Sequence, residues 1–256
     1  MRRLIRKEAH QLLQKAHSSC SVLITEANLR GLPESVQRYL RYTQIVGKET
    51  IRTVRLKQKG FFRMQEGQSW LPMVAEQYFT TNPPAFLWYG RVQPFPFVWI
   101  TGKDSFSDGH GNLRIKLLSL ITLADVRGSE VDQGEFVRYL AEMAWFPTAL
   151  LSDYIQWQAI DAQSVKATIS YQEVTTSAIL HFNQDGQLTY LTAERYWEEG
   201  GQYVLKNWSG QYSNYQEVNG ICIPTKAEVS WNLESGDFCY FRGELTNIEY
   251  NLPLPY

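Results

Sequence analysis

The sequence predicts a mainly β protein with a few helices, of the α+β class, built on a large antiparallel sheet. Between residues 155 and 250, apolar and aromatic runs alternate with short turn sequences such as Asp185-Gly186 and Asn219-Gly220. Asp-Gly and Asn-Gly between such runs are strong hairpin signatures. Aromatic residues make up 14% of the chain, and large aromatic side chains favour both pleated sheets and the walls of apolar pockets.

The predicted strands cover most of the chain. The C-terminal runs, which we expect to form an antiparallel meander, are 155–160, 165–174, 178–182, 188–197, 203–215, 221–231 and 238–250. The earlier runs are 51–62, 74–80, 86–92 and 113–123. Prolines between the earlier runs indicate edges, bends or loops. No compositional linker separates the two groups, so we predict one domain over residues 32–256.

Three segments are predicted to be helical. Residues 1–17 form a basic amphipathic pattern within an N-terminal extension, 1–31. Such a helix can lie on a membrane surface, but docking on its own domain or on a partner is the favoured interpretation. Residues 32–40 carry Pro33 at a position suited to a first helical turn. The third helix spans about 133–144, with Asp132 as its expected N-cap.

Composition and charge exclude several classes of function. The formal net charge is −1, from 25 basic and 26 acidic side chains, so we expect no nucleic-acid partner. Three cysteines without CxxC spacing, Cys20, Cys222 and Cys239, predict neither a disulfide framework nor a structural zinc site. No segment has the apolar length of a signal peptide or membrane span. We expect a cytoplasmic location and no cofactor, and the sequence leaves the oligomeric state open.

Several short motifs occur in a fixed order along the chain. They are Leu32-Pro33, Ala75-Glu76-Gln77-Tyr78, Pro84-x-Phe86-x-Trp88, Gly102-x-Asp104-x-Phe106-x-Asp108-Gly109, Arg138-Tyr139-Leu140-x-Glu142-x-x-Trp145-Phe146-Pro147, Ile223-Pro224 and Trp231. Together they resemble an uncharacterised bacterial family known only as a domain of unknown function. The family is similar in fold to the LolA-like half-barrel carriers of lipoproteins and lipids. The resemblance implies a strongly curved antiparallel sheet that wraps around helices and encloses an apolar cavity.

The third predicted helix carries the first set of candidate site residues. Arg138 and Glu142 are four residues apart, so their side chains share a helix face and can form an ion pair. They either line a cavity beside Trp145 or anchor the helix to the sheet, and ion pairs of the second kind are common. Tyr139 has the same two interpretations.

Two groups of acidic residues are further candidates. Asp104, Asp108 and His110 are close enough in sequence to hold a divalent cation, but a turn stabilised by local hydrogen bonds is the favoured interpretation. Glu76 shares a strand face with Tyr78. On the inside of a cavity its pKa would rise, and it could act as a general acid or base. The surrounding family motif favours this interior position.

Tryptophans spread through the predicted strands suggest a wide interior. Trp88, Trp99, Trp145 and Trp231 could form pocket walls. Arg195 is two residues before another tryptophan and could bind a carboxylate head group, or it could cover that indole at the surface.

Two functions remain. The leading hypothesis is a module that binds an apolar or amphipathic small molecule, lipid-like or isoprenoid-like, in an aromatic-rich cavity. The alternative is an enzyme of cyclase or isomerase type, in which Glu76 or Glu142 acts as general acid or base on an apolar intermediate. No phosphate loop, nucleophile elbow or zinc-protease motif is present.

Overall fold

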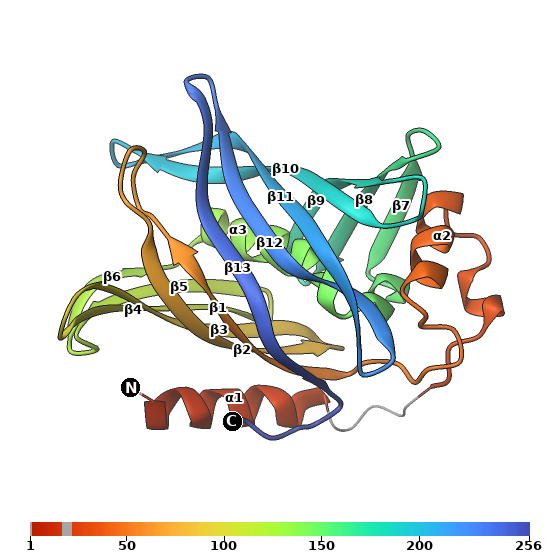
Figure 1. The fold of residues 1–256 in the computed structure, drawn as a ribbon, viewed down its shortest axis with the longest axis horizontal. Helices are drawn as coiled ribbons and strands as arrows, with labels where there is room; N and C mark the ends of the chain where they lie inside the picture. Colours follow the sequence, from red (N-terminus) through yellow and green to blue (C-terminus); the bar gives the residue numbers. More distant parts are fainter. Residues whose placement is uncertain (1, 17–21) are drawn as a thin grey trace.

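Thirteen antiparallel strands form one continuous sheet in the computed structural model, which describes residues 2–16 and 22–256 (Figure 1). The strands are β1 (Thr53–Phe62), β2 (Leu71–Thr81), β3 (Pro84–Phe95), β4 (Val98–Ser107), β5 (His110–Leu117), β6 (Ile121–Val126), β7 (Ile155–Ala159), β8 (Ser164–Tyr171), β9 (Val174–Phe182), β10 (Leu188–Glu199), β11 (Gln202–Val218), β12 (Ile221–Leu233) and β13 (Gly236–Tyr250). The predicted mainly β class and the curved antiparallel sheet are confirmed.

The sheet consists of two meanders joined at one strand pair. β1 to β6 follow one another in space, as do β7 to β13, and the β1–β13 pair joins them. The edge strands are therefore β6 and β7. The chain between them forms helix α3 (Ser129–Glu142) and the short helices η2 (Met143–Trp145) and η3 (Pro147–Leu151). α3 contacts β4 and β5 from one meander and β9 and β10 from the other, so it lies inside the curled sheet (Figure 1).

Burial of aromatic side chains holds α3 inside the sheet. Phe136 stacks on Phe106 of β4 with ring centroids 4.6 Å apart, and the buried Tyr139 packs against Phe79 of β2. Offset aromatic pairs add to the hydrophobic contribution of the buried area. The Tyr139 hydroxyl donates to the Thr80 carbonyl oxygen over 2.9 Å.

The N-terminal helix α1 (Arg2–Ala16) packs on the outer face of the sheet. Its apolar face, including Ile5, Ala9 and Leu13, lies against Tyr78 of β2 and Leu87 of β3. Arg3, Arg6, Lys7 and Lys15 of this amphipathic helix are exposed to solvent. The helix therefore docks on its own domain, as the favoured interpretation predicts. Two further short helices, η1 (Glu26–Leu29) and α2 (Glu34–Tyr42), follow.

The structure differs from the predicted local structure at three places. Asp132 is not the N-cap of α3, because the helix begins at Ser129 after Gly128. Its carboxylate instead accepts a 2.6 Å hydrogen bond from the Gly111 backbone N–H. The predicted run 113–123 is two strands, β5 and β6, and β4 was missed altogether. Pro94 and Pro96 obscured β4, since proline ordinarily interrupts a strand.

The structure adds two facts about the exclusions drawn from the sequence. Cys222 and Cys239 are free thiols, whereas Cys20 and the end of the first predicted helix lie outside the described residues. Within the described part of the chain, no helix is long and apolar enough to cross a membrane.

Candidate functional site

A cavity of about 180 Å³ lies between α3 with η2 and the concave face of the sheet. Its walls come from both meanders, because the curled sheet brings β3 and β4 opposite β10 to β13. The lining residues are Phe62, Trp88, Asp104, Leu113, Arg138, Ala141, Glu142, Trp145, Arg195, Trp208, Gly210, Tyr212, Ala227, Glu228, Val229, Tyr240 and Phe241. Aromatic side chains dominate this wall, and charged groups gather on one side of it.

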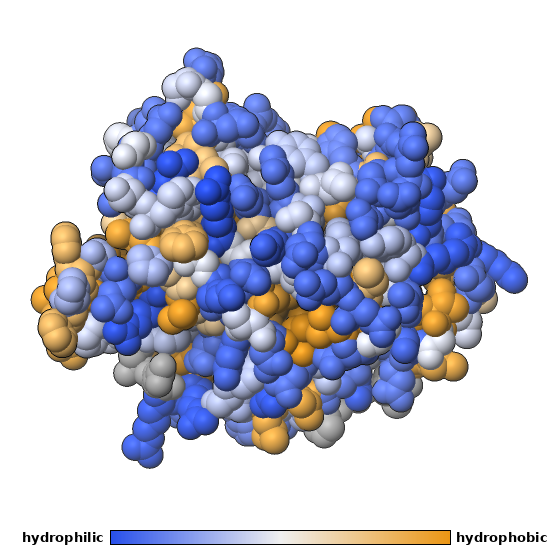
Figure 2. Space-filling model, viewed as in Figure 1, coloured by the Kyte–Doolittle hydropathy of each residue, from blue (hydrophilic) through white to orange (hydrophobic). Residues whose placement is uncertain are grey.

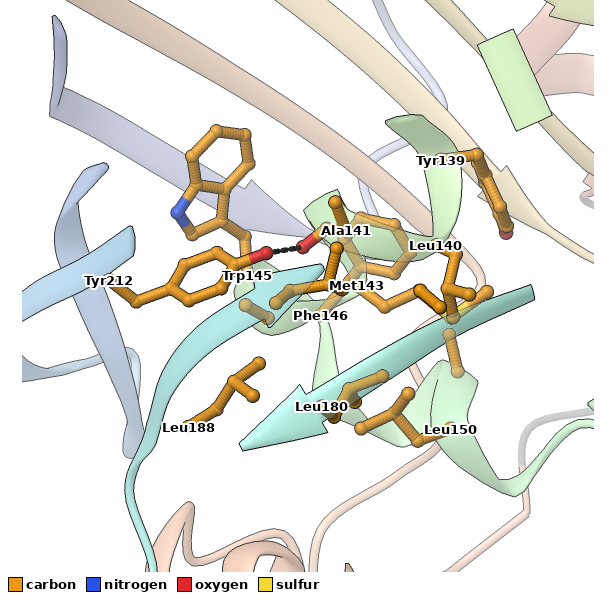
Figure 3. Packing of buried hydrophobic residues seen from close by; sticks show 14 of the residues in the cluster. Tyr139, Leu140, Ala141, Met143, Trp145, Phe146, Leu150, Leu180, Leu188 and Tyr212 are labelled. Carbon is orange, nitrogen blue, oxygen red and sulfur yellow. Dashed lines mark hydrogen bonds between the residues drawn. The ribbon is translucent and has the colours of Figure 1, made fainter. Parts of the chain in front are cut away.

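Most polar atoms of the aromatic wall already have partners. The Trp88 Nε1–H donates to Gln58 Oε1, and the Trp208 Nε1–H donates to the Tyr240 hydroxyl, each over 3.1 Å. The Tyr212 hydroxyl donates to the Ala141 carbonyl oxygen over 2.8 Å (Figure 3). These bonds fix the rings and leave their apolar surfaces towards the cavity.

Trp145 is the exception in this wall. Its side chain is only 5% exposed, and its Nε1 is buried with no hydrogen-bond partner among the described residues. A buried donor without an acceptor costs about 1–3 kcal/mol. Trp145 lies at the end of η2, where its indole stands beside the Tyr212 ring (Figure 3). A residue that lines the cavity therefore carries a buried donor without an acceptor.

Arg138 is the centre of the charged side of the cavity. Its Nη1 lies 2.5 Å from Asp104 Oδ2 of β4, and its Nε donates to Glu142 Oε1 over 3.0 Å. Gln77 of β2 donates to the other Glu142 oxygen over 2.7 Å. The Arg138 guanidinium also lies 5.1 Å from the Trp88 ring centroid. These contacts tie α3 to the first meander.

A second ion pair ties α3 to the other meander. Arg195 of β10 donates from Nη2 to Glu135 Oε1 over 3.0 Å, and the Glu135 carboxylate is almost fully buried. The guanidinium of Arg195 also lies over the Trp208 ring. The helix is thus held to both halves of the sheet by buried ion pairs.

The charged cluster carries more acids than bases. Two guanidinium groups, Arg138 and Arg195, face three carboxyl groups, Asp104, Glu135 and Glu142. If every group is ionised, the formal charge is −1. Burial raises the pKa of Glu135 to about 7, opposed by Arg195. Burial also raises the pKa of Glu142, and the Arg138 guanidinium opposes this shift.

We expect Glu135 to make the folded protein less stable as the pH rises. Its pKa is about 7 in the folded state against 4.5 ordinarily, so the folded state binds the proton more tightly. The stability this group contributes is fully present below pH 4.5 and is lost as the pH rises through 7, a difference of about 3 kcal/mol.

Urea unfolding of the wild type and Glu135→Gln between pH 4 and pH 8 checks this expectation. Gln keeps an acceptor for Arg195 but does not titrate. The titrations of all other groups largely cancel when the unfolding free energy of the variant is subtracted from that of the wild type. The wild type should lose stability relative to the variant as the pH rises. Parallel curves would show that Glu135 has an ordinary pKa.

The structure brings together five of the sequence-predicted site residues. Trp88, Arg138, Glu142, Trp145 and Arg195 all line the cavity, joined by Asp104 from the proposed metal group. Two predicted ligand-binding residues lie behind this surface. Tyr139 is part of the core, bonded to Thr80. Trp231 packs against Trp197 and Tyr240, with centroids 4.8 Å and 6.4 Å away.

Glu76 and Trp99 lie away from the cavity. Both line a shallow depression on the outer face of β1 to β4. The expectation that Glu76 faces the interior is wrong: Gln77, the next residue, points inward to Glu142, and successive strand residues alternate between faces. The general acid or base that we expected at Glu76 therefore has no place in this cavity.

Asp104, Asp108 and His110 do not converge on one point. Asp108 pairs with Lys15 of α1 over 2.7 Å, and His110 Nδ1 lies 3.5 Å from Asp132. Among the described residues, no group of three His, Cys, Asp or Glu side chains could hold a metal ion. The Lys15 and Ser107 hydrogen bonds lower the pKa of Asp108, as expected for a turn carboxylate.

Sequence reasoning missed several cavity residues, among them Tyr212 and Tyr240. It also missed Glu135 and Gln77, which bond to the cavity residues Arg195 and Glu142. The two tyrosines lie on long strands, and the alternation of buried positions along those strands was the available indication of their face. Nothing in the sequence indicated that Glu135 would meet Arg195, because sixty residues and a change of meander separate them.

The fold and the site define a curled half-barrel that encloses a helix and an aromatic-walled cavity. The chain belongs to the Family of unknown function (DUF6544), whose model matches residues 22–243. This confirms the family of unknown function and the half-barrel fold that the ordered motifs imply.

Two solved structures are similar to the chain at low identity. One is described as a "putative outer membrane lipoprotein-sorting protein domain" from Vibrio parahaemolyticus, with 10% identity and a TM-score of 0.47, covering 87% of this chain and 93% of that one. The other is a LolA superfamily protein from Nitrosomonas europaea, with 13% identity and a TM-score of 0.39, covering 86% and 94%. No curated protein matches the chain.

Proposed function

We propose that the protein binds an apolar or amphipathic small molecule in the cavity between α3 and the sheet. The observation that carries this proposal is an aromatic-walled cavity with an unused buried donor, the Trp145 Nε1–H. Ligand sites are typically apolar concavities with a few placed polar groups.

The volume of the cavity sets the size of the group it would hold. An engineered cavity of about 150 Å³ binds benzene, and this one measures about 180 Å³. It therefore suits one ring or a short branched chain, such as an isoprenoid unit or the end of a lipid. Phe62, Val229 and Phe241 in the lining are partly exposed, and a longer ligand would extend past them.

The polar side of the cavity favours a neutral head group. Arg195, which the sequence suggested as a carboxylate ligand, already pairs with Glu135, and Arg138 already pairs with Asp104 and Glu142. An anionic ligand would add a further negative charge beside an excess of carboxylates, at low dielectric. A carbonyl, ether or hydroxyl oxygen would instead accept the Trp145 Nε1–H.

Acid–base catalysis is the less favoured function. Glu142 lines the cavity, and burial raises its pKa, but Arg138 and Gln77 both donate hydrogen bonds to its carboxylate and favour the ionised form. Hydrogen bonds that stabilise the ionised form make a carboxylate a weaker base. These contacts favour a structural role for Glu142, which helps to hold α3 on the sheet.

We expect Trp145→Phe to remove selectivity for a hydrogen-bond acceptor. Acetophenone and α-methylstyrene have nearly the same shape, but only acetophenone carries an acceptor oxygen. The ratio of their dissociation constants should change by about 2- to 12-fold in the variant, because one net hydrogen bond contributes about 0.5–1.5 kcal/mol. Titration followed by protein NMR measures both constants.

Trp208→Phe is the matched control. It shortens another indole of the same wall, but its N–H already bonds to Tyr240 and should not contribute to selectivity. Using the ratio of two ligands cancels any general loss of packing. If neither probe binds the wild type, the proposed site is wrong. If both variants change the ratio equally, Trp145 is not the donor.

A further inference from the structure

The ends of two neighbouring hairpins carry the most exposed apolar side chains of the described chain. Phe95 at the end of β3 and Phe97 in the turn before β4 are 68% and 89% exposed. Leu120, Ile121 and Leu123, between β5 and β6 and along β6, are exposed as well. Figure 2 shows apolar surface gathered at the left end of the molecule, where β4 to β6 end in Figure 1.

The two hairpin ends form one surface, which we call the hairpin patch (Phe95, Phe97, Leu120, Ile121 and Leu123). β4 joins them: it pairs with β3 on one side and with β5 on the other. The Leu118 backbone N–H donates to the Trp99 carbonyl oxygen over 2.9 Å. This bond ties the turn after β5 to the start of β4. A patch of this kind on a soluble protein marks an interaction site.

Basic side chains lie behind the patch. The two hairpins carry Arg91, Lys103, Arg114 and Lys116. Lys103 pairs with Glu8 and Arg114 pairs with Asp125, so Arg91 and Lys116 supply the positive charge of the hairpins. Arg91 pairs across from Thr101, and Thr101 from Lys116. Directly opposite residues share a face, so Arg91 and Lys116 lie in one row on the outer face, just behind the exposed apolar ends.

Helix α1 adds positive charge on the same side. Glu8 pairs with Lys103, and Lys15 pairs with Asp108 at the far end of β4, so α1 runs parallel to β4 and its N-terminus points towards the patch. From the level of Lys103, β4 extends about 16 Å to its start. The helix extends only about 7 Å to the exposed Arg3. The patch therefore projects roughly 10 Å beyond the basic end of α1.

We infer that the hairpin patch docks on an anionic membrane surface, with the apolar hairpin ends in the acyl boundary and the basic residues among the lipid head groups. The apolar side chains would enter the acyl boundary, and the basic residues behind them would lie at the level of the anionic head groups. The positive charge in both hairpins and in α1 is the observation that selects an anionic lipid surface over a second copy of this chain. Two chains that met through this patch would bring their basic residues together, and these like charges would repel.

Co-sedimentation of the full chain with lipid vesicles tests this inference. The protein should bind vesicles of equal parts phosphatidylglycerol and phosphatidylcholine, and bind phosphatidylcholine alone more weakly. Phe95→Ser with Phe97→Ser should lower the partition coefficient at least about tenfold, since two apolar side chains no longer enter the membrane. Lys116→Gln should lower it about fivefold, and added salt should weaken binding to the anionic vesicles.

Leu205→Ser, at an exposed apolar residue of the β10–β11 hairpin, is the matched control and should stay within about twofold of the wild type. Lys116→Gln keeps the test valid if the double serine variant does not fold. Equal binding to both vesicle types, or unchanged binding of the patch variants, would overturn the inference. So would dimerisation without vesicles that the double serine variant abolishes, which would assign the patch to a second copy.

Discussion

Replacing Arg138 with leucine is expected to destabilise the protein by about 3–5 kcal/mol. Arg138 lies between Asp104 and Glu142, and Glu135 is also close. Without the guanidinium, Asp104 and Glu142 remain buried with no compensating charge, whereas Glu135 keeps its ion pair with Arg195. Breaking a buried ion pair from one side leaves this full desolvation penalty. Denaturant unfolding at pH 8 measures the loss.

The same variant should recover stability in acid. Protonation of the carboxyl groups removes their unpaired charge, so the difference from the wild type should be smaller at pH 5 than at pH 8. Arg242→Leu breaks a half-exposed ion pair with Glu228 and should cost no more than about 1 kcal/mol. A loss at Arg138 no larger than this control would mean that the cluster does not anchor α3.

Filling the cavity is expected to abolish ligand binding while keeping the fold. Ala227 is a buried residue of β12 that lines the cavity, and Ala227→Leu would place three more carbons in it. We expect the affinity for acetophenone to fall at least about tenfold, while cavity filling adds about 0.5–2 kcal/mol of stability. NMR titration and thermal unfolding measure the two effects.

Ala159→Leu, on an exposed part of β7, adds the same atoms outside the cavity and should change neither binding nor melting temperature by much. A variant at position 227 that melts no lower than the wild type but no longer binds the probe would place the ligand in this cavity. Unchanged affinity in a folded Ala227→Leu protein would show that the probe binds elsewhere.

The strands of the C-terminal half could be predicted from sequence because their determinants are local. Asp185-Gly186 and Asn219-Gly220 provide backbone geometry that tight hairpins need, and alternating apolar residues fix which face is buried. The signal for β4 was weaker, since Pro94 and Pro96 stand just before it. Pro94 is accommodated beside a shift in the β3–β4 register, between Val92 and Phe95, which sequence patterns do not reveal.

The ion pair of Arg138 and Glu142 follows from helical spacing alone, and so does the shared face of Glu76 and Tyr78. Residue spacing does not indicate which face of β2 points into the interior of the sheet, and the prediction placed Glu76 on the wrong face. α1 covers Tyr78 on the outer face, so a buried residue there says nothing about the cavity.

The sequence by itself determined the class of fold, the family and the Arg138–Glu142 pair, because turn chemistry, strand alternation and helix spacing all act over a few residues. Only the tertiary structure decided which side chains meet inside the sheet. Asp104, Glu135 and Arg195 come from three separate elements, and the Trp145 indole of η2 lies beside the Tyr212 ring of β11. Such contacts depend on how far a long sheet curls around one helix, which is set by the packing of the whole core.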